Sequence, residues 1–182
     1  MVPYLTSLQC FVTLACPHLG QTSTPLSFFK TGAWAVRKLT GLRVLHELDL
    51  DDAEDPRETT LYRLSLSPGL ERFRTIVFAA NPRDGFVPLH SASVRCLPAS
   101  GTSTSRTASA SAEMAEMLMS KVDERANRVV RMTLDAPRSK PAQGTLDSVI
   151  GRPGHMCFID SAQVAWLISL ALLPFMEETR KE

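Results

Sequence analysis

An aspartate and a histidine each follow a short apolar run in this 182-residue sequence. Asp84 lies in a predicted loop, Asn-Pro-Arg-Asp-Gly-Phe-Val-Pro at residues 81–88, and His155 ends a second predicted loop, Gly-Arg-Pro-Gly-His at residues 151–155. A histidine base needs a partner that fixes its tautomer and stabilises the imidazolium, and a buried carboxylate does both. We therefore take the two residues as candidates for a hydrolytic triad, with Asp84 as the acid and His155 as the general base.

Duller roles for both residues remain open on the sequence alone. Asp84 can simply serve its turn, where Asp and Gly are common, and His155 can cap or flank a helix. In serine hydrolases built on a parallel sheet the triad runs in the order nucleophile, acid, base, with the serine on a Gly-x-Ser-x-Gly turn. No such motif occurs in the sequence.

Two residues are candidates to replace the absent serine. Cys16 precedes Asp84 and follows an apolar run, but Pro17 comes next and has no N–H to donate to an oxyanion. Ser103 follows Asp84 in a Ser- and Thr-rich stretch, so its order along the chain is wrong. Neither residue is a convincing nucleophile.

The composition is that of an ordinary globular domain, with 44% hydrophobic and 21% charged residues. Twenty scattered Lys and Arg residues balance 19 acids, which argues against nucleic-acid binding. The cysteines (Cys10, Cys16, Cys96 and Cys157) form no Cys-x-x-Cys pair and have no histidine at metal-ligand spacing. We therefore expect reduced thiols, no metal, no cofactor and a cytoplasmic protein.

Three apolar and β-branched runs, at residues 11–15, 74–80 and 128–134, are typical of strands, and the first has the pattern of a fully buried strand. Helical spacing predicts helices within residues 24–41, 59–66, 114–126 and 161–178. Long crossovers between strands predict a parallel sheet and the α/β class. Reactive groups gather beyond the carboxyl ends of such strands, where residues 16–18, Asp84 and His155 all fall.

Two segments have unusual compositions. Residues 98–111 are almost all Ser, Thr, Ala and Gly, which predicts a flexible insertion. Residues 162–176 are almost wholly apolar but shorter than the roughly 20 residues that cross a bilayer, so we predict a core helix without a transmembrane span. Peripheral membrane attachment through this segment is the alternative. The helix is expected to bury Val164, Trp166, Leu167, Leu170 and Leu173.

Three stretches carry a resemblance to a known family: Phe-Val-Thr-Leu-Ala-Cys-Pro-His-Leu-Gly at residues 11–20, and residues 81–92 and 150–161. They resemble the last third of the lipase-like serine esterase family of α/β-hydrolases, and among its members the large eukaryotic proteins called family with sequence similarity 135. The resemblance implies one partial domain over residues 1–182: the C-terminal portion of an α/β-hydrolase fold, with about three parallel strands, flanking helices and an incomplete sheet. It implies that Asp84 is the triad acid, His155 the base, and His18 a structural neighbour of the site.

In that family the serine elbow precedes the strand that matches residues 11–15, so it would lie before Met1. The resemblance then implies a chain that hydrolyses a carboxylic ester, a lipid or acyl ester, only when the missing N-terminal half is supplied, and that is inactive alone. The alternative is a non-catalytic hydrolase-like protein that serves binding or scaffolding. In either case the strand at residues 11–15 would have an open edge, through which we expect self-association.

Overall fold

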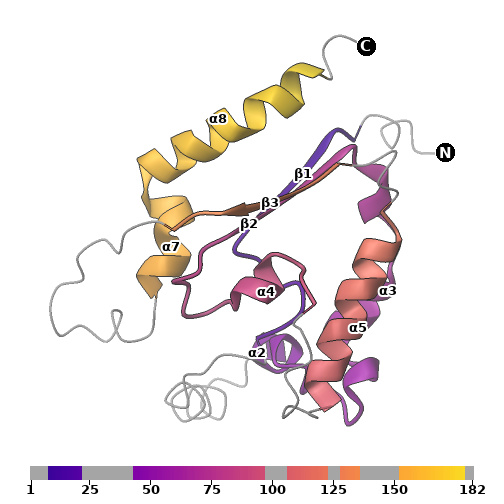
Figure 1. Cartoon of the computed structure of the whole chain (residues 1–182). Coiled ribbons are helices and arrows are strands. Elements are labelled where there is room, and N and C mark those ends of the chain that lie inside the picture. The colour runs from indigo at the N-terminus through magenta and orange to yellow at the C-terminus, as the bar shows by residue number, and fades with distance from the viewer. Residues whose placement is uncertain (1–7, 22–42, 97–105, 123–127, 136–151, 179–182) are drawn as a thin grey trace, which may run out of the picture.

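The computed structural model describes residues 8–21, 43–96, 106–122, 128–135 and 152–178. Within them, β1 (Cys10–Leu14), β2 (Thr75–Ala80) and β3 (Arg128–Thr133) form one parallel sheet in the order β1-β2-β3 (Figure 1). Cys10 is paired with Thr75, and Thr75 with Arg128. The expected class is confirmed: a partial α/β fold with an incomplete parallel sheet.

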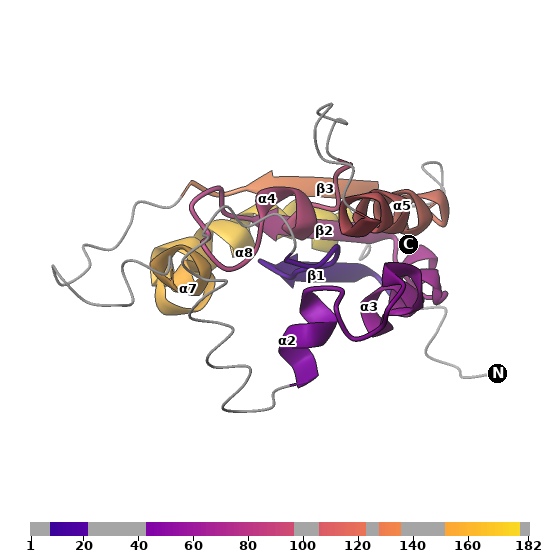
Figure 2. The ribbon, with the colours of Figure 1, turned by 90° about the horizontal axis from the view of Figure 1, so that it is seen from below.

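Helices cover both faces of the sheet. The helices between β1 and β3 lie on one face, and the two that follow β3 reach the other face (Figures 1 and 2). They are α2 (Arg43–Leu48), the 3-10 helices η2 (Pro56–Glu58) and η3 (Leu70–Arg72), α3 (Thr60–Leu66), α4 (Leu89–Ala92), α5 (Arg106–Ser120), α7 (Arg152–Asp160) and α8 (Ala162–Glu178). The three strands point toward α7, so their carboxyl ends lie at the edge of the sheet nearest that helix (Figure 2).

Strand β2 is the centre of the molecule, and all six of its residues are buried. Ile76 and Phe78 join the cluster formed with α3 and α5, whereas Ala79 joins the cluster that contains Phe158 of α7 and Ile168 of α8. This alternation is the two-residue period of a strand, and a parallel strand covered on both faces reads as a continuous apolar run. The apolar run therefore identified the strand that presents Asp84.

The structure corrects the expected flexible insertion. Helix α5 begins at Arg106, so residues 106–111 are helical, whereas the rest of that segment lies outside the described residues. Ala110 and Ser111 are buried, and the Ser111 hydroxyl donates to the Leu19 carbonyl at 2.9 Å. Small side chains let the helix lie close to the Leu19 backbone, and this packing offsets the cost of ordering a segment with few apolar groups. The helix expected within residues 24–41 also lies outside the described residues.

The closing helix α8 is present, but the prediction of its buried side chains was largely wrong. Val164 and Ile168 are buried against the sheet, whereas the side chain of Trp166 is 62% exposed. The exposed side chains also include Leu167, Leu170 and Leu173. Only one narrow stripe of α8 touches the sheet, and the hydrophobic period of a sequence does not reveal how much of a helix its neighbours cover.

None of the described helices is by itself long and apolar enough to cross a membrane. The segments Gly154–Asp160 and Ala162–Phe175 meet that criterion only when taken together, and a bend of 76° separates them.

Strand β1 differs from the fully buried strand that its sequence suggests. Among the described residues it pairs with β2 alone, and its Val12 and Leu14 side chains are exposed. Their register partners are Val77 and Ala79, so they lie on the face of the sheet that carries α8. One edge of the described sheet is therefore open and apolar.

Met114 tests the packing between α5 and the sheet. Its side chain is fully buried, so Met114→Ala should lower the free energy of unfolding by about 2–5 kcal/mol through lost burial and a residual cavity. Leu64→Ala, at an exposed position of α3, should change it by less than about 0.5 kcal/mol. Urea unfolding of both variants checks this, and equal losses would contradict the assigned core.

Candidate active site

The carboxylate of Asp84 lies in the loop that follows β2, and its side chain is only 1% exposed. Its Oδ1 atom accepts hydrogen bonds from the backbone N–H groups of Phe86 at 2.8 Å and Val87 at 3.0 Å. Its Oδ2 atom lies 2.8 Å from Nδ1 of His155. The backbone therefore holds one oxygen of the carboxylate and aims the other at the imidazole.

His155 lies in α7, which corrects the expected loop at residues 151–155. Its side chain is 35% exposed, and its ring meets the edge of Phe86 with centroids 5.5 Å apart. Because an ionised carboxylate only accepts hydrogen bonds, Nδ1 must carry the proton, which leaves Nε2 as the basic nitrogen of the neutral ring. The structure thus brings the two predicted residues into direct contact.

The hydrogen bond to Asp84, reinforced by the negative charge of the carboxylate, raises the pKa of His155 above its ordinary value, while partial burial opposes this shift. A raised pKa means that the imidazolium is stabilised when the ring takes up a proton. That stabilisation is what a general base requires of its partner.

Gly154 explains why α7 can approach the Asp84 loop so closely. A Cβ atom at this position would lie 2.2 Å from the carbonyl oxygen of Arg83 and 3.0 Å from Cα of Asp84. Glycine alone leaves room for this contact between two backbones. The Gly-Arg-Pro-Gly sequence resembles a turn, yet proline is tolerated in the first turn of a helix.

An ion pair ties the same loop to the end of β3. Nε of Arg83 lies 2.7 Å from Oδ1 of Asp135, and Nη2 donates to Oδ2 at 3.2 Å. Both side chains are about half exposed, so the pair contributes little to stability. Its two-point geometry nevertheless orients the loop that carries Asp84.

His18 follows β1 and has the surroundings of a packed side chain. Its Nε2 atom lies 3.0 Å from the Thr13 hydroxyl, and its ring meets Phe78 edge-on at 5.1 Å. Burial lowers the pKa of His18 to about 4, so the ring is neutral at pH 7. These contacts fit the structural role that the family resemblance implies.

Cys16 has little of the character of a nucleophile. It is a free thiol in a half-buried position. Burial raises the pKa of the Cys16 thiol, which reduces the thiolate fraction that could attack a substrate. Among the described residues no group of His, Cys, Asp and Glu side chains could hold a metal ion.

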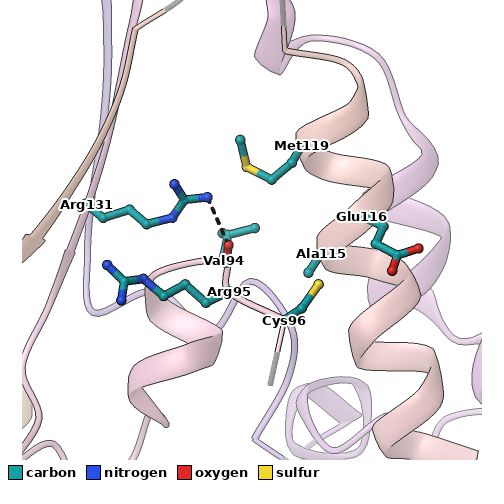
Figure 3. Close-up of a pocket in the computed structure, with 7 residues that line it drawn as sticks. All are labelled: Val94, Arg95, Cys96, Ala115, Glu116, Met119 and Arg131. Carbon is teal, nitrogen blue, oxygen red and sulfur yellow. Dashed lines mark hydrogen bonds between the residues drawn. The ribbon is translucent and has the colours of Figure 1, made fainter. Parts of the chain in front are cut away.

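A cavity of about 480 Å³ lies between β3, α5 and the turn after α4 (Figure 3). Arg131 crosses it and donates from Nε to the Ser93 carbonyl at 2.9 Å and from Nη2 to the Val94 carbonyl at 3.2 Å. Neither Asp84 nor His155 lines this cavity. The guanidinium thus fastens the end of α4 to the sheet, a contact that no sequence pattern indicated.

The described residues thus form a parallel α/β sheet with a buried carboxylate and a histidine at its carboxyl edge. The family model described as "Putative serine esterase (DUF676)" matches residues 5–98, more than half of the chain. The chain belongs to this family. The match spans β1, β2 and the Asp84 loop, whereas His155 lies outside it. No solved structure matches the chain.

The Asp84–His155 contact makes a prediction about pH. Because the pKa of His155 is raised in the folded state, its stabilisation is fully present below the ordinary value of 6.5 and is lost as pH rises through the folded pKa. Asp84→Asn should lower the free energy of unfolding by about 1–2 kcal/mol between about pH 5 and 6, and by less above about pH 8. Because the His155 ring is partly exposed to solvent, this loss in the free energy of unfolding lies at the lower end of what hydrogen bonds between charged groups contribute.

Chemical unfolding at several pH values measures this difference. The control is Asp51→Asn, which removes an exposed contact of 3.3 Å to His46 and should cost less than about 1 kcal/mol at every pH. A loss in Asp84→Asn that does not vary with pH would show that the carboxylate does not stabilise the imidazolium.

Proposed function

We propose that this chain provides the acid and base of a carboxylic ester hydrolysis site. Asp84 orients the imidazole, and Nε2 of His155 acts as general base and then as general acid. The observation that carries the proposal is the buried carboxylate of Asp84, held by two backbone N–H groups and placed 2.8 Å from a partly exposed histidine. Membership of a family described as serine esterases supports the same chemistry.

The pair would act twice in each turnover. Nε2 of His155 takes the proton of a serine hydroxyl while the serine oxygen bonds to the ester carbonyl carbon, and the carbonyl electrons move to the oxygen. The imidazolium then protonates the leaving alkoxide as the ester C–O bond breaks. Water then attacks the acyl-enzyme and gives a proton to Nε2. The imidazolium returns that proton to the serine oxygen as the ester bond to the serine breaks. Likeness to lipases makes a lipid or acyl ester the proposed substrate.

In this proposal the nucleophilic serine is not one of the 182 residues, because they contain no Gly-x-Ser-x-Gly motif. The open edge of β1 indicates where a serine-bearing strand would be added. A further parallel strand at that edge would end on the same side of the sheet as the Asp84 loop, where reactive groups of such sheets gather. By this proposal the chain alone is inactive.

Labelling with a fluorophosphonate probe tests the proposal. We expect no labelling of the 182-residue chain, and serine labelling of a restored protein in which a segment that carries a Gly-x-Ser-x-Gly turn is fused before Met1. His155→Ala should then slow labelling by at least about a hundredfold. His90→Ala, at a histidine of α4 outside the pair, should leave the rate unchanged.

Three results would count against this assignment. Labelling of the chain alone that Asp84→Asn abolishes would show that a nucleophile is already present. Labelling of the restored protein that is insensitive to His155→Ala would remove the histidine from the chemistry. An upstream frame without the serine turn would favour the non-catalytic binding protein.

We also propose that the isolated chain self-associates through β1. Within the part of the chain that the structure describes, β1 pairs with β2 alone, and Val12 and Leu14 are exposed beside its other edge. An open apolar strand edge is a template for pairing with another chain. Size-exclusion chromatography should show oligomers, and Val12→Lys should shift the population toward monomer. Leu64→Lys, at an exposed leucine of α3, should not. A monomeric wild-type chain would refute the proposal.

A further inference from the structure

Asn81 is the first residue after β2 and is 1% exposed. Its Oδ1 atom accepts a hydrogen bond from the backbone N–H of Arg83 at 2.9 Å. Its Nδ2 group donates to the carbonyl of Gly154 at 2.9 Å and lies 3.2 Å from Sγ of Cys157. One buried amide therefore touches the loop that carries Asp84 and the helix that carries His155.

We propose that Asn81 is a positioning residue that sets the distance between Asp84 and His155. The inference rests on the proposed function, in which these two residues are the acid and base. Arg83 immediately precedes Asp84, and Gly154 immediately precedes His155, so the amide bonds to the neighbour of each. The backbone carbonyl of Asn81 also accepts from the Asp84 N–H at 3.1 Å, which closes the turn around the carboxylate.

The chemistry of the bridge requires an amide. The Arg83 side of the gap presents an N–H group and the Gly154 side presents a carbonyl, so the bridging group must accept on one side and donate on the other. Asparagine does both with one short side chain, whereas an ionised aspartate has no donor and leucine has neither function. A buried polar group without its partner costs about 1–3 kcal/mol, so the two hydrogen bonds are expected to hold.

The close contact at Gly154 limits how near α7 can come to the Asp84 loop, and the Asn81 bridge limits how far apart they can move. Since even a Cβ atom there would collide with the Arg83 carbonyl, the helix and the loop already touch and cannot move closer. The hydrogen bonds of the Asn81 amide to both segments oppose their separation. Repulsion on one side and hydrogen bonds on the other fix the spacing at which Nδ1 of His155 reaches Oδ2 of Asp84.

The alternative is that Asn81 serves stability alone, as any satisfied buried polar residue does. Ser111 provides the matched control because it is also buried and also bridges two segments, donating to the Leu19 carbonyl at 2.9 Å. Ser111→Ala should lower the melting temperature without altering the Asp84–His155 contact. A positioning role requires Asn81 variants to alter that contact.

Nuclear magnetic resonance of the full chain with ¹⁵N-labelled histidine measures the contact directly. The readouts are the signal of the His155 Nδ1 proton, assigned by its loss in His155→Gln, and the pKa of that ring. In Asn81→Ala we expect the proton signal to exchange away and the pKa of His155 to fall toward its ordinary value of 6.5. In Ser111→Ala both should match the wild type.

Asn81→Ser guards against a variant that fails to fold. Its hydroxyl can still accept from the Arg83 N–H in the turn, but it is too short to donate to Gly154 at the same time, so the turn survives and the bridge is lost. We expect the same changes at His155 as in Asn81→Ala. In the restored, serine-containing protein, kcat should fall by about ten- to a hundredfold with KM unchanged, as for a small misplacement of a catalytic group.

The outcomes separate this inference from the proposed function. A folded Asn81→Ser chain whose His155 proton signal and pKa equal those of the wild type would overturn the positioning role and leave the acid–base pair intact. An Asp84→Asn chain whose His155 proton signal and pKa equal those of the wild type would overturn both proposals. Such a result would mean that the pair does not form.

Discussion

The buried carboxylate of Asp84 is the constraint on which the other features of the site depend. An ionised carboxylate that leaves water is strongly destabilising unless hydrogen bonds replace its hydration. Two backbone N–H groups and the His155 ring provide that replacement, and they come from segments about 70 residues apart in the sequence. The loop after β2 and the first turn of α7 must therefore be correct together, since either one alone would leave the charge without a partner.

The sheet supplies the rigidity that this arrangement needs. Strand β2 is buried on both faces, so the residue at which it ends is fixed by packing, and the loop after it starts from a defined point. Two hydrogen bonds also hold the turn after β1. The Leu19 N–H donates to the Ser91 hydroxyl of α4, and the Leu19 carbonyl accepts from the Ser111 hydroxyl of α5. Arg131 of β3 holds the carbonyls at the end of α4. Each segment at this edge is thus bonded to a neighbour far from it in sequence.

Strands and helices that depend on local sequence patterns were predictable from the sequence. Burial and hydrogen bonds that depend on contact between distant segments were not. The continuous apolar run of β2 and the place of Asp84 after it were predictable because a parallel strand buries both faces. The helical state of His155 was not, because Gly-Arg-Pro-Gly resembles a turn until the approach of Arg83 explains the glycine. The exposure of Trp166 was hidden for the same reason, since periodicity identifies a helix but not its neighbours. Asn81 resembled one more turn residue until its amide was seen to bridge two segments.

The exposed apolar surface lies on the side of the molecule where, in the proposed function, a serine-bearing strand would be added. Val12 and Leu14 project from the edge strand onto the face that α8 only partly covers, and the leucines of α8 are exposed on that helix. A parallel strand followed by a helix would pair with β1 and cover these side chains in one step, because crossovers in parallel sheets place helices on the faces. The strand in that position is also the one whose carboxyl end would lie at the edge of the Asp84–His155 pair. In the proposed function, one added strand would therefore both bury this apolar surface and bring the serine to Asp84 and His155. A polypeptide that pairs with β1 but carries no serine would then give a folded but inactive protein.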